Sequence, residues 1–126
     1  MVFLSPAAPP VVLVVDDDPD VRGILAMLLT REGYEVATAI DGADALNYAG
    51  DPRIALLVLD LQMPRLDGDT FRRVYRERGG HAPILLITAA EVSPDDLARI
   101  GADAYIAKPF DVDNVLETIA RLVSAA

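Results

Sequence analysis

Short apolar runs of strand length alternate along this chain with segments in which apolar residues recur every three or four positions. Continuous apolar runs are typical of buried strands, and the wider spacing is typical of amphipathic helices. The predicted strands are Val11–Val15, 34–39, Ile54–Leu59, 83–88 and Ala104–Ala107. Helices are predicted over 19–33 and 43–49, between the loop at 65–68 and Gly79, from Ser93 to Gly101, and over 111–123.

Turn and capping residues support these helix ends. Asp18 followed by Pro19 is typical of an N-cap and a first helical residue, and Ser93-Pro94 repeats that pattern. Gly33 and Gly101 stand where glycine commonly ends a helix. The helix that opens at Ser93 is expected to be only about two turns long.

Five strands that alternate with five helices predict the α/β class. Because crossovers between parallel strands are right-handed, the helices should cover both faces of a doubly wound, mostly parallel, five-stranded sheet. The periodicity does not set the order of the strands in that sheet.

Length and composition narrow the range of functions. The chain has 126 residues, enough for one domain with a proper core, and we expect that domain over 11–124 after a flexible leader over 1–10. It has no cysteine, which fits a cytoplasmic protein, and no apolar run long enough to span a membrane. The formal net charge of -9 argues against direct nucleic-acid binding and favours cations or basic partner surfaces.

Candidate site residues lie at the carboxyl ends of the predicted strands. They are Asp16 and Asp17, Asp60 with Gln62 two positions later, Thr88 with Ala89, Tyr105, and Lys108 with Pro109. A parallel sheet collects the carboxyl ends of its strands at one edge, where such folds bind ligands. Three carboxylates, a hydroxyl and an ammonium group at this edge therefore indicate a site for a cation and a phosphoryl group.

Each of these signals has a plainer alternative when it is taken alone. Asp16 and Asp17 could be solvated residues attracted by a helix N-terminus, or they could hold Mg²⁺, which prefers oxygen ligands. Asp60 could be a turn residue, a metal ligand or a nucleophile, since carboxylates form acyl phosphates. Lys108, the single lysine, could be a solvated surface residue or could bind a phosphoryl oxygen. The peptide bond before Pro109 is a candidate for the cis form.

Together the motifs VVDDD, LVLDLQMPRLDG, LLITA and GADAYIAKPF resemble the receiver domain of bacterial response regulators, from about Val11 to Val123. The resemblance implies a flavodoxin-like fold. It implies that Asp60 accepts a phosphoryl group from a histidine kinase or a phosphotransfer protein. It also implies that Mg²⁺, with Mn²⁺ able to substitute, is held by Asp16, Asp17, Asp60 and the backbone carbonyl of Gln62.

The resemblance further implies a switch. Lys108 and Thr88, with Ala89 beside it, would bind the phosphoryl group, Tyr105 would turn inward, and Pro109 would follow a cis peptide bond. The expected output face comprises the fourth helix, the fifth strand and the last helix, acting on a downstream protein or output domain. We expect a monomer or weak dimer that dephosphorylates itself without turning over an external substrate.

Some residues depart from the family pattern or point to other functions. The segment from Thr88 to Gly101 is short, which argues against a standard dimer through that face, and Ala90 leaves an open approach for water. The alternative function is a Mg²⁺-dependent phosphatase of the haloacid-dehalogenase type, but Gln62 stands where its general acid would be needed. His81 lies before the fourth strand and is expected to be a solvated loop residue.

Overall fold

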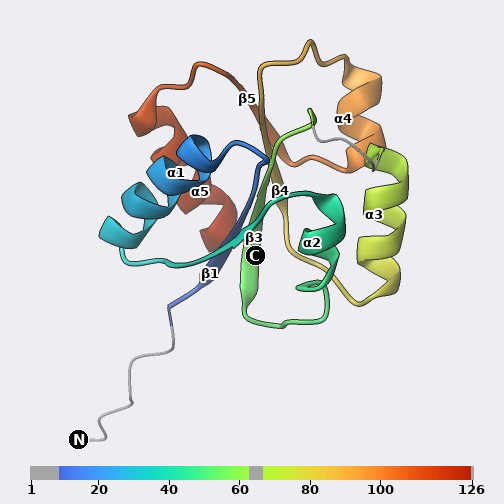
Figure 1. The fold of residues 1–126 in the computed structure, drawn as a ribbon, viewed down its shortest axis with the longest axis horizontal. Helices are drawn as coiled ribbons and strands as arrows, with labels where there is room; N and C mark the ends of the chain where they lie inside the picture. Colours follow the sequence, from blue (N-terminus) through green and yellow to red (C-terminus); the bar gives the residue numbers. More distant parts are fainter. Residues whose placement is uncertain (1–8, 63–66, 126) are drawn as a thin grey trace, which may run out of the picture.

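The computed structural model describes residues 9–62 and 67–125, which form a single five-stranded sheet between two layers of helices (Figure 1). The strands are β1 (Val11–Val15), β2 (Glu35–Ala39), β3 (Ile54–Leu59), β4 (Ile84–Thr88) and β5 (Ala104–Ala107). All pair in parallel, in the order β2-β1-β3-β4-β5. The α/β class, the five-stranded parallel sheet and the helices on both faces are therefore confirmed.

The helices are α1 (Pro19–Arg31), α2 (Gly42–Leu46), α3 (Gly68–Glu77), α4 (Pro94–Ile100) and α5 (Val112–Ala125). One of them is clearly shorter than the sequence predicts. Helix α2 ends at Leu46, and turns follow to Gly50, so the predicted helix over 43–49 is too long. Helix α4 is as short as expected, at seven residues. The predicted leader lies mostly outside the described residues, as does the first part of the loop at 65–68.

Capping explains where the helices begin. The Asp18 side chain accepts a hydrogen bond from the Asp20 amide at 2.8 Å, and Pro19 opens α1, as the sequence predicts. Ser93 and Asp96 form a capping box at the start of α4, with side-chain to backbone hydrogen bonds of 3.1 and 2.9 Å. Gly101 ends α4 in the left-handed conformation, which glycine adopts without steric cost.

The sheet divides the core into two layers. One face packs against α1 and α5, through residues such as Leu25, Leu29 and Ile119. The other face packs against α2, α3 and α4, through Phe71, Tyr75 and Ile100 among others. The central strands β1, β3 and β4 are buried on both faces, which explains their continuous apolar runs. This rigid sheet fixes the positions of the residues that follow each strand.

Candidate functional site

Asp16 and Asp60 lie side by side at the carboxyl ends of the two central strands. Val15 and Leu59, the residues before them, are partners in the β1–β3 ladder. The backbone amides of both aspartates continue the pairing between strands. The Asp60 amide donates to the carbonyl of Val15 at 3.1 Å, and the Asp16 amide donates to the carbonyl of Ala39 at 3.2 Å. Both side chains are almost fully buried, with 3% and 4% of the residue exposed. The folding of the sheet therefore sets the spacing of these two carboxylates.

Asp17 completes a cluster of three acids. One carboxylate oxygen from each of Asp16, Asp17 and Asp60 lies within 4.8 Å of the others. Asp17 is exposed, so the cluster is open to solvent on one side. A hard cation that keeps some of its waters suits such a set of oxygen ligands, and Mg²⁺ is the common biological example. The donor chemistry thus fits the metal that the sequence predicts.

Lys108 links the two buried carboxylates. Its Nζ donates to Asp16 Oδ2 at 2.8 Å and to Asp60 Oδ2 at 2.7 Å. The backbone holds the lysine in place, because its amide donates to the carbonyl of Thr88 at 2.9 Å. The Lys108–Pro109 peptide bond is cis, as the sequence predicted. The ammonium group thus supplies the positive charge that two adjacent buried carboxylates need.

Backbone amides occupy the remaining carboxylate oxygens. The Asp18 amide donates to Asp16 Oδ1 and the Gln62 amide donates to Asp60 Oδ1, both at 2.9 Å. Each bond joins residues two positions apart, so the sharp turn after each strand supplies its own donor. These bonds fix the orientation of both carboxylates and stabilise their charged form.

The two buried aspartates differ in acidity. Burial raises the pKa of Asp16, and the hydrogen bonds from Lys108 and the Asp18 amide only partly offset it. Burial also raises the pKa of Asp60, but bonds from Lys108, the Gln62 amide and the Thr88 hydroxyl outweigh it, so that pKa lies below its ordinary value. The negative charge of Asp60 also raises the pKa of Asp16, and Asp16 has no contribution from the Thr88 hydroxyl. Asp60 is therefore ionised at neutral pH and available as a nucleophile.

The lysine responds to the same contacts. Burial disfavours its charged form, yet the hydrogen bonds and charges of Asp16 and Asp60 raise the pKa of Lys108 above its ordinary value. The site thus holds an ammonium ion between two acids.

The other predicted site residues surround this centre at different depths. Thr88 is fully buried at the end of β4, and its hydroxyl accepts a hydrogen bond from the Ala90 amide at 3.2 Å. Ala89 is exposed beside it, and Pro109 is exposed after the lysine. Tyr105 points outward, with 38% of the residue exposed. The hydroxyl lies with the carboxylate–lysine centre, whereas the tyrosine does not contribute to it in this conformation.

Sequence reasoning missed one contact at this edge. A guanidinium nitrogen of Arg22 donates to the backbone carbonyl of Asp16 at 2.7 Å. Arg22 lies in the first turn of α1, immediately after the acidic run, and a basic residue at that place was the available signal. His81, by contrast, is exposed before β4, as predicted.

Comparisons with known proteins agree with this arrangement. The family model described as "Response regulator receiver domain" matches residues 12–120. The response regulator MprA of Mycobacterium avium is 41% identical over 114 residues, which are 89% of this chain and 50% of MprA. The chain thus spans about half the length of the curated relatives it matches.

Solved structures show the same fold. The chemotaxis protein CheY4 of Vibrio cholerae superposes with a TM-score of 0.79 at 34% identity, over 91% of this chain and 99% of that one. TrrA of Thermotoga maritima, solved as a complex with Mg²⁺ and BeF, superposes with a TM-score of 0.77 at 35% identity, over 90% of this chain and 98% of TrrA.

Among the described residues, no helix is both long and apolar enough to cross a membrane.

Proposed function

Because the chain belongs to the response regulator receiver domain family, we propose that it takes a phosphoryl group onto Asp60 from a histidine kinase or a histidine phosphotransfer protein. The observation that carries this proposal is the pair of contacts from Lys108 to Asp16 and Asp60. A site built only for stability would gain little from two buried acids held by one ammonium group, since burying charge is costly. The domain that performs this function is assigned to residues 11–124.

Asp16, Asp17, Asp60 and the backbone carbonyl of Gln62 would hold the Mg²⁺, and Mn²⁺, with similar ligand preferences, would substitute. The clustered carboxylates and the TrrA complex with Mg²⁺ support this assignment. When bound, the metal neutralises charge on the phosphoryl oxygens as they approach the acidic site.

The residues of the chain then act as follows. An ionised oxygen of Asp60 attacks the phosphorus and forms a new O–P bond. The P–N bond of the donor histidine breaks, and its electron pair returns to the imidazole. Lys108 remains beside Asp60 and binds a phosphoryl oxygen, while Thr88, already next to Asp60, donates a hydrogen bond from its hydroxyl to another. Hydrolysis of the acyl phosphate by water returns the carboxylate, without turnover of any external substrate.

Phosphorylation would shift the molecule between two conformations. A phosphoryl group adds about two negative charges and several strong acceptors. Only a conformation in which Thr88 and Lys108 reach those oxygens gains from them, so its population rises. Tyr105, exposed here, turns inward in that conformation. The face formed by α4, β5 and α5 then acts on a downstream protein or output domain in the cytoplasm. The domain itself is a monomer or weak dimer and does not bind nucleic acid.

The alternative function of a haloacid-dehalogenase-type phosphatase is not favoured. Such an enzyme needs a general acid two residues after its nucleophilic aspartate. The residue there is Gln62, whose amide cannot deliver a proton as a carboxylic acid does.

The test is incubation with acetyl phosphate and Mg²⁺, followed by intact mass and size measurement. The wild-type protein should gain the mass of one phosphoryl group, and the gain should disappear in Asp60→Asn or when Mg²⁺ is chelated. Asp95→Asn, which makes the same change at an exposed helical position, is the matched control and should gain mass as the wild type does. An equal gain in Asp60→Asn would refute the proposal.

A further inference from the structure

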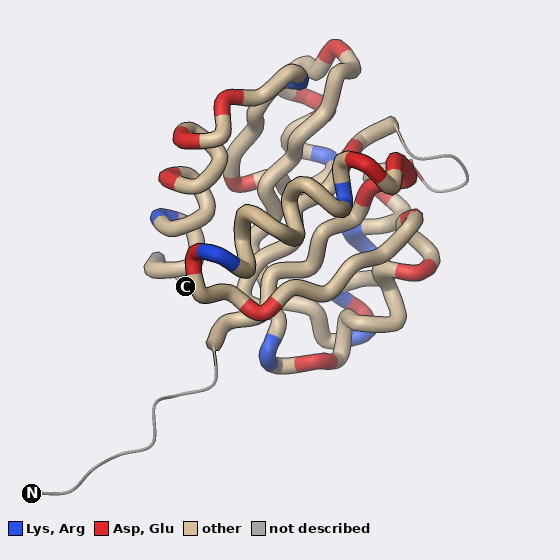
Figure 2. Tube along the Cα trace, turned by 60° about the vertical axis from the view of Figure 1, so that its left-hand side comes forward, with Lys and Arg blue, Asp and Glu red and all other residues tan. Residues whose placement is uncertain are grey.

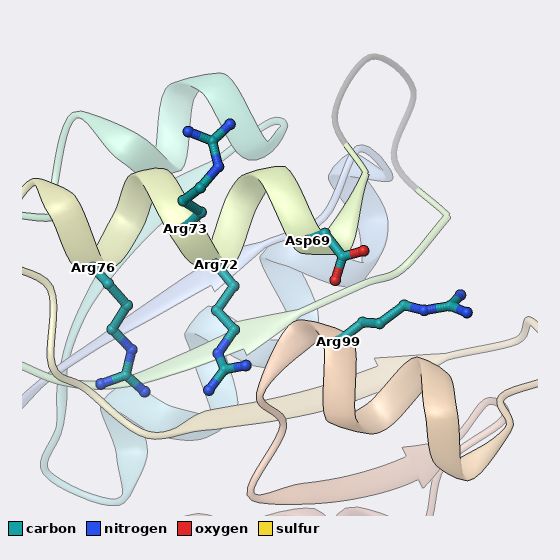
Figure 3. Close-up of a pocket in the computed structure, with 5 residues that line it drawn as sticks. All are labelled: Asp69, Arg72, Arg73, Arg76 and Arg99. Atoms are coloured by element: carbon teal, nitrogen blue, oxygen red, sulfur yellow. The ribbon is translucent and has the colours of Figure 1, made fainter.

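A cleft lined by arginines lies between α3 and α4. We call it the arginine cleft; its volume is about 500 Å³, and its lining residues are Asp69, Arg72, Arg73, Arg76 and Arg99 (Figure 3). Four positive side chains and a single acid thus surround it. We propose that the arginine cleft binds an acidic segment of a partner protein through ion pairs with Arg72, Arg76 and Arg99.

The charge of the cleft is opposite to that of the whole molecule. The formal net charge of the chain is -9, and acidic residues are spread along most of the described trace (Figure 2). Four of the eleven lysines and arginines nevertheless fall within the seven residues 72–78. Solubility alone would not require the few positive side chains to be concentrated on one helix. A local positive surface on an acidic protein attracts anions to that surface alone.

The arginines of α3 repel one another in the isolated domain. Arg72 and Arg76 are four positions apart, where like charges on a helix are destabilising. They extend from the same side of α3, while Arg73 points away from them (Figure 3). Arg73 has an acidic neighbour in Glu77, at 3.5 Å, but for Arg76 no ion pair is found among residues 9–62 and 67–125. Carboxylates in the cleft would relieve this repulsion.

The structure holds Arg72 in place before any ligand binds. Its guanidinium donates to the Ala98 carbonyl of α4 at 3.4 Å. Its Nε also lies so near Gly101 that a Cβ on that glycine would be only 2.7 Å away. A side chain that is already ordered loses less conformational entropy on binding. Arg99 reaches the same cleft from α4, so two helices supply the cationic groups.

The chemistry of the lining favours a protein segment over a nucleic acid. All five lining residues are charged, and none offers an aromatic ring on which a base could stack. A long polyanion would also meet the negative charge of the surrounding surface. A short run of glutamates or aspartates needs only the cleft itself, because guanidinium groups bind carboxylates in a bidentate manner.

The test measures fluorescence anisotropy of a short fluorescein-labelled peptide rich in glutamate, titrated with the full chain at low salt without Mg²⁺ or phosphodonor. The proposal goes beyond the phosphoacceptor function and does not rest on it, so Asp60→Asn should bind the peptide as the wild type does. The peptide in which glutamine replaces glutamate should not bind, and added salt should weaken binding of the glutamate peptide.

Charge reversal supplies the decisive comparison. Arg76→Glu should weaken binding by about tenfold or more, whereas Arg121→Glu, the same change at an exposed position of α5 on the other face, should not. Arg99→Gln, a milder change in the cleft, should also weaken binding, and circular dichroism should show all three variants folded. The proposal is overturned if the wild type does not bind, if Arg76→Glu and Arg121→Glu bind alike, or if a single-stranded oligonucleotide occupies the cleft more tightly than the peptide.

Discussion

Replacement of Lys108 by methionine should destabilise the metal-free protein strongly. Methionine has nearly the length of lysine but no charge, so the change removes the ammonium group and keeps most of the packing. It leaves the carboxylates of Asp16 and Asp60 buried, without the contacts of 2.8 and 2.7 Å that now compensate them. The loss should therefore far exceed that of an ordinary surface charge.

The structure gives the size of the effect. Carboxylate oxygens of the two aspartates come within 4.8 Å, where two unit charges in an effective dielectric of about 20 repel by about 3.5 kcal/mol. Removing one partner of a buried ion pair typically costs about 3–5 kcal/mol. The side chain of Lys108 is 18% exposed, so some of its charge is already screened by solvent. We expect the free energy of unfolding to fall by about 3 kcal/mol.

Urea denaturation in the presence of a chelator measures this loss, and its pH dependence identifies the cause. Without the lysine, burial and mutual repulsion raise the folded-state pKa of the two carboxylates. A raised folded-state pKa means that stability is lost as the pH rises and is regained as it falls toward the ordinary pKa of a carboxyl group. The difference between the wild type and Lys108→Met should therefore shrink between neutral and acidic pH.

Arg121→Met, which removes one positive charge from an exposed position, is the control and should change the free energy of unfolding by less than about 1 kcal/mol. If Lys108→Met and Arg121→Met lose the same small amount, or if the loss for Lys108→Met does not depend on pH, the ammonium group does not compensate the buried acids and the reasoning is wrong.

Three further predictions concern packing, metal binding and hydrolysis. Gly80→Ala should lower the free energy of unfolding by about 1–3 kcal/mol in urea denaturation, because the added Cβ would clash with the Tyr75 ring. Gly23→Ala, which has open space around it in α1, should instead stabilise the protein, and equal effects of the two changes would contradict this packing. Asp16→Asn should weaken Mg²⁺ binding, measured by calorimetry, without lowering the stability of the metal-free protein, since burial raises the pKa of Asp16 and disfavours its charge. A fall of more than about 1 kcal/mol in the metal-free free energy of unfolding would contradict this. Ala90→Lys should slow the decay of the phosphorylated protein by closing the approach of water, and equal decay rates would argue against an open path.

The fold was predictable where local signals and burial agree. The continuous apolar runs of β1 and β3 are buried on both faces, as expected for the central strands of a parallel sheet. Asp18 and Ser93 cap α1 and α4 because their side chains accept hydrogen bonds from backbone amides in the first turn of each helix. The end of α2 was not predictable, since the apolar spacing runs on through Ala49 and Asn47 offers no clear stop.

The site was predictable because the topology gathers strand ends, but its energetics were not. That Asp16, Asp60 and Lys108 meet follows from parallel strands with residues at the same end. The opposite pKa shifts of the two aspartates depend on the balance between burial and the hydrogen bonds and charges around each carboxylate, which sequence spacing does not show. The arginine cleft likewise depends on how α4 packs against α3, which the sequence does not show.

Chemical trapping of the phosphorylated residue tests the central claim most directly. Borohydride reduces an aspartyl phosphate to homoserine, and peptide mass mapping then locates the modified position. After incubation with Mg²⁺ and acetyl phosphate, we predict homoserine at position 60 alone, with Asp16 and Asp17 unchanged. Homoserine at another aspartate, or a phosphorylated protein that borohydride does not reduce, would contradict the account.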